Sequence, residues 1–234
     1  HRDLLTAYRR QRQMCIRDSI LLALLSLLFF TNSNAACDDP LTEGVDYSNC
    51  RFSDSQDLQG SYLPNSNLSF ASFIQVNFDK SIMMTSNLSF GTFPESTFVR
   101  ANLYESVSIG ANFEKTNFTG ANLTRVDFMG ATLIEANFQN SNLMEANFTS
   151  SNITNANFDG ANLTGATIEY ANLKSSSFRN AILKDAKIVG ADLTDVNFQY
   201  ADFLQARISS NVTLNADFCN SRKSDGTRNS ECSR

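Results

Sequence analysis

A large apolar residue recurs at every fifth position over most of the chain. Within residues 136–163, the residues in this rhythm are Phe138, Leu143, Phe148, Ile153, Phe158 and Leu163. A five-residue step turns an α-helix by about 140° net, so no helix face would be apolar. The same odd step along a flat strand sends each large residue to the opposite face from the last. The chain must therefore turn a corner once per pentad, so that every large residue faces a common axis.

The other positions of the pentad agree with such a coil. From Leu58 to Ile208 the large residue, here called the centre, is Leu, Ile, Met or Phe, and Ser108 is the exception. From Ser61 to Ala206 the residue two places earlier is Ala, Ser, Gly, Thr or Val, and it lies inside because residues two apart in extended chain share a face. Between them stands usually Asn, Asp, Ser or Thr, which should point outward. The residues after each centre, including Pro64 and Pro94, are typical of tight turns.

Centres twenty residues apart form columns of like residues. One column is rich in Phe and the next is rich in Leu, as stacking of successive 20-residue turns would produce. Each turn then has four sides of one pentad. About eight turns at about 4.8 Å per stacked strand predict a rod of about 40 Å.

The repeated pattern A-N-F/L-x-x, over about residues 56–218, resembles the pentapeptide-repeat family. The resemblance implies an all-β fold, a right-handed quadrilateral β-solenoid with the centres and small residues packed inside. Residues 37–55 and 219–234 are then expected to be an N-terminal cap and a C-terminal hairpin cap. The predicted core ladder comprises Phe78, Phe98, Phe118, Phe138, Phe158, Phe178, Phe198, Leu103, Leu123, Leu143 and Leu163.

Residues 1–36 are interpreted as a signal peptide. The apolar run Ile20–Phe30 is too short for a membrane span and fits a secretory signal with cleavage near Ala35 or Ala36. The alternatives are an uncleaved anchor and, less favoured, a lipid anchor at Cys37. Residues 1–19 contain "RRQRQMCIRDS", which resembles sequencing-adapter read-through and is interpreted as an artefact. We expect an exported protein, periplasmic or extracellular.

Residues 1–35 hold five of the 19 basic and two of the 24 acidic residues, which leaves 14 basic and 22 acidic residues, net −8, for residues 36–234. This acidity is scattered, and it disfavours binding to nucleic acid or to anionic lipid.

Four cysteines remain after the leader, and four allow three pairings. Asp225-Gly226 is a favoured two-residue hairpin turn, and counting outward from it sets Cys219 opposite Cys232. The other bond would join Cys37 and Cys50. "GVDYSNC" and the C-terminal "FCN", "DG" and final Cys also resemble the disulfide-closed caps of exported members of the family. Four unpaired thiols are the alternative.

The sequence offers little for catalysis. Beyond the leader it has no His and no Trp, and the cysteine spacings do not fit zinc. We therefore predict a protein that is not an enzyme, with no cofactor, metal or small-molecule substrate. Paired acids such as Asp192 and Asp195 are better explained by a solvated face.

Two features stand outside the pattern. Ser108 replaces a centre, and we expect a local bulge in which Val107 or Ile109 fills the gap rather than a specific site. Phe70 and Phe90 lie one coil apart outside the core pattern, so they should stack on an outer face. They are a possible contact surface, although an N-terminal cap folding over them is the favoured explanation.

The predicted function is a non-catalytic, exported structural or protein-interaction module whose protein partner and oligomeric state are open. One alternative is a DNA-mimicking protector or inhibitor of a topoisomerase, as in the family's quinolone-resistance members. The other is a lumenal protein of a photosynthetic system, where related disulfide-capped solenoids occur.

Overall fold

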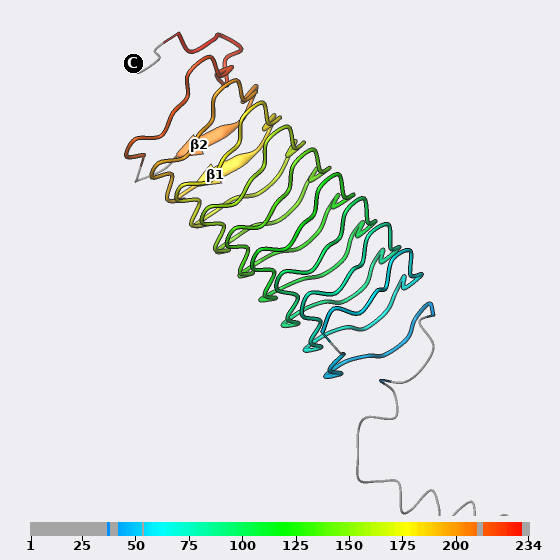
Figure 1. Cartoon of the computed structure of the whole chain (residues 1–234). Helices are drawn as coiled ribbons and strands as arrows, with labels where there is room; N and C mark the ends of the chain where they lie inside the picture. Colours follow the sequence, from blue (N-terminus) through cyan, green and yellow to red (C-terminus); the bar gives the residue numbers. More distant parts are fainter. Residues whose placement is uncertain (1–36, 38–41, 53, 210–212, 231–234) are drawn as a thin grey trace, which may run out of the picture. The chain divides into compact units, whose positions relative to one another are not determined.

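The computed structural model describes residues 37, 42–52, 54–209 and 213–230. The chain divides into two compact units, residues 1–38 and 39–234. Of the first unit only Cys37 is described, so the predicted signal peptide lies outside the described residues. The second unit is a stack of coils, each lying on the one before it (Figure 1).

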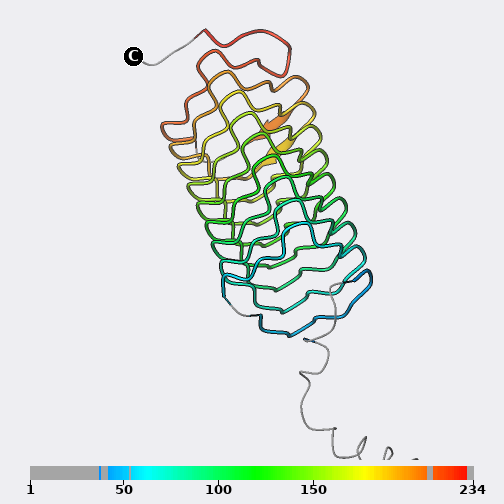
Figure 2. The same cartoon turned by 45° about the vertical axis from the view of Figure 1, so that its right-hand side comes forward.

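Parallel bridges between residues twenty apart join the successive coils. Asp57 pairs with Asn77, and the same step recurs as far as Asp202 with Arg222. Two segments are long enough to be strands, β1 (Lys187–Val189) and β2 (Arg207–Ser209), and they pair in parallel in the same register. Figure 2 shows the coils from a second direction, stacked along one axis. The fold is the predicted β-solenoid, with one pentad on each of four sides.

Each pentad ends in a tight turn that closes one corner of the coil. After the centre Phe98, the Ala101 N–H donates to the Phe98 carbonyl oxygen at 3.0 Å, and Arg100 has a φ of 57°. A positive φ at the third turn position is the mark of a type II turn, which accepts proline just before it, as at Pro94. Most corners nevertheless carry residues other than Gly, although a left-handed backbone costs such residues about 1–2 kcal/mol.

The outward Asn residues close these turns from the side. Asn112 Oδ1 accepts the N–H of Glu114 at 2.9 Å, and Asn117 Oδ1 accepts both the N–H and the hydroxyl of Thr119, at 3.0 and 2.6 Å. These are Asx turns, in which a short polar side chain satisfies a backbone donor two residues later. The recurring Asn of the sequence thus stabilises the corner as well as facing solvent.

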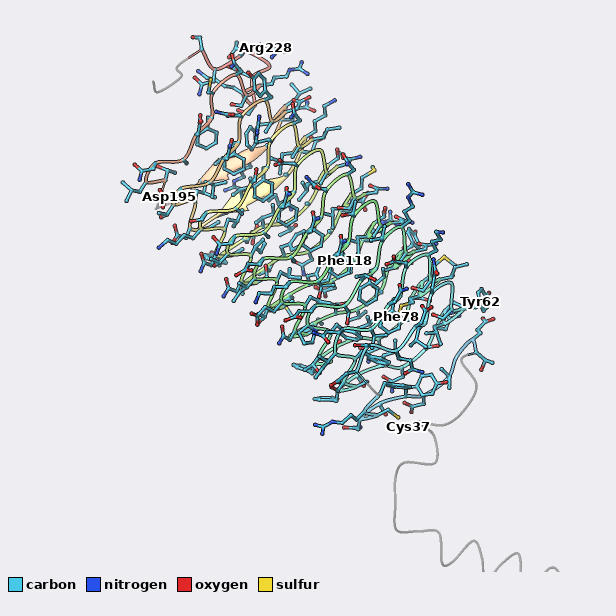
Figure 3. The ribbon with its side chains drawn as sticks, viewed as in Figure 1. Cys37, Tyr62, Phe78, Phe118, Asp195 and Arg228 are labelled. Atoms are coloured by element: carbon cyan, nitrogen blue, oxygen red, sulfur yellow. The ribbon has the colours of Figure 1, made fainter. Side chains whose placement is uncertain are left out.

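The core is a ladder of rings and branched side chains along the axis. All eleven residues of the predicted core ladder are 0% exposed. Consecutive rings from Phe78 to Phe198 stack with centroids 4.5–5.2 Å apart. Figure 3 shows Phe78 and Phe118 inside the coils, whereas Tyr62 lies at the edge.

The bulge expected at Ser108 is wrong. Val107 keeps its bridges to Asn87 and Asp127, and the Ser108 N–H donates to the Asp127 carbonyl oxygen at 2.8 Å. Ser108 is 0% exposed, while Val107 and Ile109 are partly exposed like their counterparts in other pentads. Ladder hydrogen bonds on both sides hold the register, so neither Val107 nor Ile109 turns inward to replace the missing large side chain.

Both ends of the ladder extend past the boundaries predicted for the repeats. Asp46 and Arg51 already pair with Asn67 and Ser72, through a step of 21 residues instead of 20. Tyr47, which follows Asp46, is fully buried as a centre would be. The first segment expected to be a cap therefore contributes a distorted coil of the solenoid.

The C-terminal hairpin forms, but its register differs from the prediction. Lys223 pairs with Thr227, whose carbonyl oxygen accepts the Lys223 N–H at 2.7 Å, and Arg222 lies antiparallel to Arg228. The loop thus has three residues instead of two, with Gly226 at a φ of 88°. A glycine in the left-handed region at the end of a three-residue loop is a common hairpin geometry.

Candidate interaction surface

One corner of the solenoid differs from the others because its left-handed turn positions carry aromatic residues and no charge. This aromatic corner consists of the turn residues Phe70, Phe90, Gly110, Gly130, Ser150, Tyr170 and Gly190. Within residues 54–209, each of the other three corners carries charged residues. They are Lys80 and Arg100 on one corner, Glu105, Arg125, Glu145 and Asp185 on the second, and Glu95, Lys115, Glu135 and Asp195 on the third.

The aromatic side chains of this corner lie along the solenoid axis and remain exposed. Phe70 and Phe90 stack with ring centroids 5.1 Å apart and an interplanar angle of 17°. They are 57% and 52% exposed, so the described part of the N-terminal segment leaves more than half of each side chain in solvent. The predicted stacking is therefore present.

Gly110 and Gly190 leave room for the rings of Phe90 and Tyr170, which lie one coil before them. A Cβ atom on Gly110 would lie 2.7 Å from a ring carbon of Phe90, and one on Gly190 would lie 2.7 Å from a ring carbon of Tyr170. Side-chain carbons do not approach so closely. The corner therefore pairs a ring with a glycine twice along its length.

Tyr170 was missed by the sequence reasoning, although it is the most exposed ring of the corner at 67%. It lies in the same column as Phe70 and Phe90, a multiple of twenty residues away, and this spacing is the signal that identifies it. Met129, 40% exposed, precedes Gly130 on the same corner. Glu169, partly exposed, precedes Tyr170, and within residues 54–209 it is the one charged turn residue of this corner. Apolar side chains thus occur along most of its length.

The charged corner around Arg125 forms a short ion ladder across three coils. The Arg125 guanidinium contacts Glu105 at 3.1 Å and Glu145 at 2.8 Å, one coil away on either side. Hydrogen bonds from Tyr104 and Arg125 lower the pKa of Glu105, and bonds to Glu145 and Glu105 raise the pKa of Arg125. All three charged side chains are exposed, so this cluster fits a solvated structural contact better than a catalytic site.

The described cysteines are consistent with covalently closed ends. Cys37, Cys50 and Cys219 are each disulfide-bonded. Cys232 lies outside the described residues, so the pairing of Cys219 with Cys232, and of Cys37 with Cys50, stays a prediction.

No metal-binding cluster of His, Cys, Asp and Glu occurs within the described residues. In the same part of the chain, no helix has the length and apolarity to cross a membrane. A pocket of about 280 Å³ lies near the C-terminal end, lined by Phe203, Ile208, Phe218, Ser221, Lys223, Ser224 and Asn229. With one cation and no acid in its lining, it shows no acid–base pair.

Comparisons with solved structures found chains that are similar to this one. Full-length QnrB1, a plasmid-mediated fluoroquinolone resistance protein, matches with a TM-score of 0.54 and 19% identity, over 66% of this chain and 83% of that chain. HetL, involved in heterocyst differentiation in the cyanobacterium Nostoc, matches with a TM-score of 0.33 and 22% identity, over 84% and 96%. A pentapeptide repeat protein from the thylakoid lumen of Arabidopsis thaliana matches with a TM-score of 0.21 and 33% identity, over 47% and 66%.

The QnrB1 likeness shows a shared fold alone. A comparison with curated proteins found no match. The family model of pentapeptide repeats matches in eight copies, which overlap from residue 57 to residue 210. This match spans more than half of the sequence, and the stacked pentads of the structure agree with it. The chain belongs to the pentapeptide repeat family.

Proposed function

We propose that this protein is an exported, non-catalytic interaction module that binds a partner protein through its aromatic corner. The observation that carries the proposal is the position of Phe70, Phe90 and Tyr170, three exposed rings on one corner whose left-handed turn positions carry no charge. Exposed apolar residues gathered in one place commonly mark a contact site, whereas scattered ones do not.

The size of the corner indicates what kind of partner fits it. The exposed parts of the three rings amount to roughly 350 Å² of apolar surface. A standard protein interface buries about 800 Å² on each side. The partner must therefore also cover Met129, Glu169 and the polar sides next to the corner, and a groove with apolar walls would fit the three rings.

Rings that anchor an interface are expected to dominate its binding energy. The first experiment replaces Phe90 by a photo-crosslinking phenylalanine analogue and identifies the protein that becomes attached in the native compartment. Asn140, on another corner, is the control position. The affinity of the purified partner is then measured for Phe90→Ala, Tyr170→Ala and Tyr200→Ala.

Tyr200 is the matched control, because it is 52% exposed like Phe90 but lies on another corner. We expect Phe90→Ala and Tyr170→Ala each to raise Kd at least about tenfold, equivalent to about 1.4 kcal/mol, and Tyr200→Ala to leave it unchanged. Equal effects of all three substitutions would exclude the aromatic corner as the binding surface.

Export and the capped ends are proposed together, because disulfides persist in oxidising compartments. The bonded states of Cys37, Cys50 and Cys219 support this. Intact mass of the protein from its native source, alkylated with and without reductant, tests both. We expect a chain that starts near Ala36 and four cysteines that react only after reduction. A retained leader with four reactive thiols contradicts export.

Mimicry of DNA is less well supported as a mechanism. A duplex mimic needs a continuous array of negative charge, yet Lys115 stands between Glu95 and Glu135 on one corner, and Arg125 between Glu105 and Glu145 on another. A gyrase supercoiling assay with a fluoroquinolone separates the two functions. Protection of the enzyme by this protein would favour mimicry over the proposed interaction module.

A further inference from the structure

Ser108 lies in the core at a position where the neighbouring coils carry a large apolar side chain. Leu88 and Phe128 are the centres one coil before and after it, and both are fully buried. Serine is much smaller than either of them. The Phe128 ring stacks on Phe148, with centroids 5.4 Å apart, but the residue before it in the column contributes no ring. One face of Phe128 thus borders the position where bulk is missing.

The backbone cannot close this gap by moving inward. The Val107 N–H donates to the Ser86 carbonyl oxygen at 2.9 Å, and the Ser108 N–H donates to the Asp127 carbonyl oxygen at 2.8 Å. Inward movement of this strand would break a ladder bond to the coil on one side or the other. Phe113 reaches Phe128 only by an edge contact, with centroids 5.6 Å apart. A space beside Ser108 is therefore retained.

Two buried hydroxyl groups at this position of the coil, those of Ser106 and Ser108, lack hydrogen-bond partners. Ser106 and Ser108 are both 0% exposed, and the Oγ atoms of both are buried without a hydrogen-bond partner. Because they lie two residues apart in extended chain, both side chains are directed inward. Several other inward hydroxyls are satisfied, as Ser86 is by donating to the Leu63 carbonyl oxygen at 2.6 Å. Ser61 and Ser81 also lack partners, but the centres that follow them, Leu63 and Met83, are large, so Ser106 and Ser108 are the pair that lies where a large side chain is missing.

We propose that Ser106 and Ser108 form an internal site that binds one water molecule in the core of the solenoid. A water needs only about 10–15 Å³ of probe-occupied volume and two to four polar partners, and it is the usual partner of buried hydroxyls that protein groups leave unsatisfied. The two Oγ atoms supply two of those partners. The apolar walls formed by Leu88, Phe113 and Phe128 exclude a larger polar ligand.

Water-oxygen magnetic relaxation dispersion on the purified protein tests the site, because it detects waters held far longer than surface waters. Ser108→Leu fills the space with the residue type found at position 88, and we expect it to remove the signal of one long-lived water. Ser141→Ala is the control, because that inward hydroxyl already donates to the Phe138 carbonyl oxygen at 2.7 Å. This variant should retain the full signal.

Ser106→Ala provides an independent readout if the Leu side chain prevents folding. Removal of one partner should shorten the residence time of the water several-fold, without filling the space. An unchanged dispersion in both Ser108→Leu and Ser106→Ala would overturn the proposal. So would xenon bound beside Phe128 in crystals of the unaltered protein, because a dry apolar cavity takes xenon and a hydrated one does not.

Discussion

The stacked core predicts that one ring in the middle of the solenoid contributes several kcal/mol to stability. Phe118 is 0% exposed and stacks between Phe98 and Phe138, at centroid distances of 5.1 and 5.0 Å. Phe113 and Phe128 contact it edge-on at 5.3 and 6.0 Å. Its surroundings are therefore closed on every side within the core.

The cost of Phe118→Ala follows from the area and volume removed. Loss of roughly 100 Å² of buried apolar area costs about 2.5 kcal/mol at about 25 cal/mol per Å². Adjacent coils are held at a fixed spacing by the ladder, so the site collapses poorly. A residual cavity of about 60 Å³ then adds about 1.5 kcal/mol at about 24 cal/mol per Å³. The expected total of about 4 kcal/mol lies within the range typical of Phe→Ala in cores.

Urea unfolding followed by circular dichroism measures this cost. Tyr200→Ala is the control, because its side chain is 52% exposed, and we expect it to change the free energy of unfolding by at most about 0.5 kcal/mol. In a solenoid each coil contacts only its neighbours, so Phe118→Ala is also expected to lower the m-value by uncoupling the two halves. A loss below about 1.5 kcal/mol would refute the closed, poorly collapsing core.

Three further predictions concern the corners and the turns. Both Gly110→Ala and Gly130→Ala introduce a side chain at positive φ, but only position 110 has a ring 2.7 Å from the new Cβ, whereas position 130 has nothing within 4 Å. Gly110→Ala should therefore destabilise by about 1–3 kcal/mol more in thermal unfolding, and Phe90→Ala in the same chain should abolish the difference. Hydrogen bonds from Thr194 lower the pKa of Asp192 below its ordinary value of 3.8, so its contribution to stability is present above that pH and lost as pH falls through the folded pKa. Asp192→Asn, which keeps a neutral acceptor for the turn, should flatten the acid limb of the stability–pH curve and slightly lower stability at pH 7, where the charge of Asp192 contributes. Arg125→Ala should destabilise at low ionic strength, and about 1 M salt should remove the difference from the unaltered protein because both ion pairs are exposed.

The sequence predicts the solenoid because residues that pair between coils are regularly twenty apart in the chain. The number of a residue therefore indicates where it lies in its coil. Residues twenty apart must stack, so like residues in a column, such as Phe138 and Phe158, indicate both the length of a turn and the direction of each side chain. Few folds have so direct a relation, since most cores join segments whose separation in the chain varies.

The predictions that differ from the structure concern places where the twenty-residue spacing changes, or where the hydrogen bonds between coils outweigh a local preference. Tyr47 has a centre's environment, but an extra residue before the regular repeats shifts it out of phase with the other centres. A bulge at Ser108 would fill the core, yet it would break ladder hydrogen bonds, and the ladder determines the outcome. In the C-terminal hairpin, Asp225-Gly226 identifies the turn but does not decide between two and three loop residues, because Gly accepts positive φ in either geometry.

Local preferences for backbone conformation and for burial also apply to the residues of the aromatic corner. Phe70, Phe90 and Tyr170 have φ values of 58°, 58° and 55°, a conformation that favours Gly or Asn, and they leave more than half of each side chain in solvent. Backbone preference and solvation both oppose aromatic residues there, and positions that violate local rules are often functional. Tyr200, with a φ of 61°, has the same two disadvantages but is isolated in its column. The local violation alone therefore does not identify a binding site. What distinguishes the aromatic corner is that three such residues lie in one column whose left-handed turn positions carry no charge. For this reason the effect of Phe90→Ala on binding must be compared with that of Tyr200→Ala.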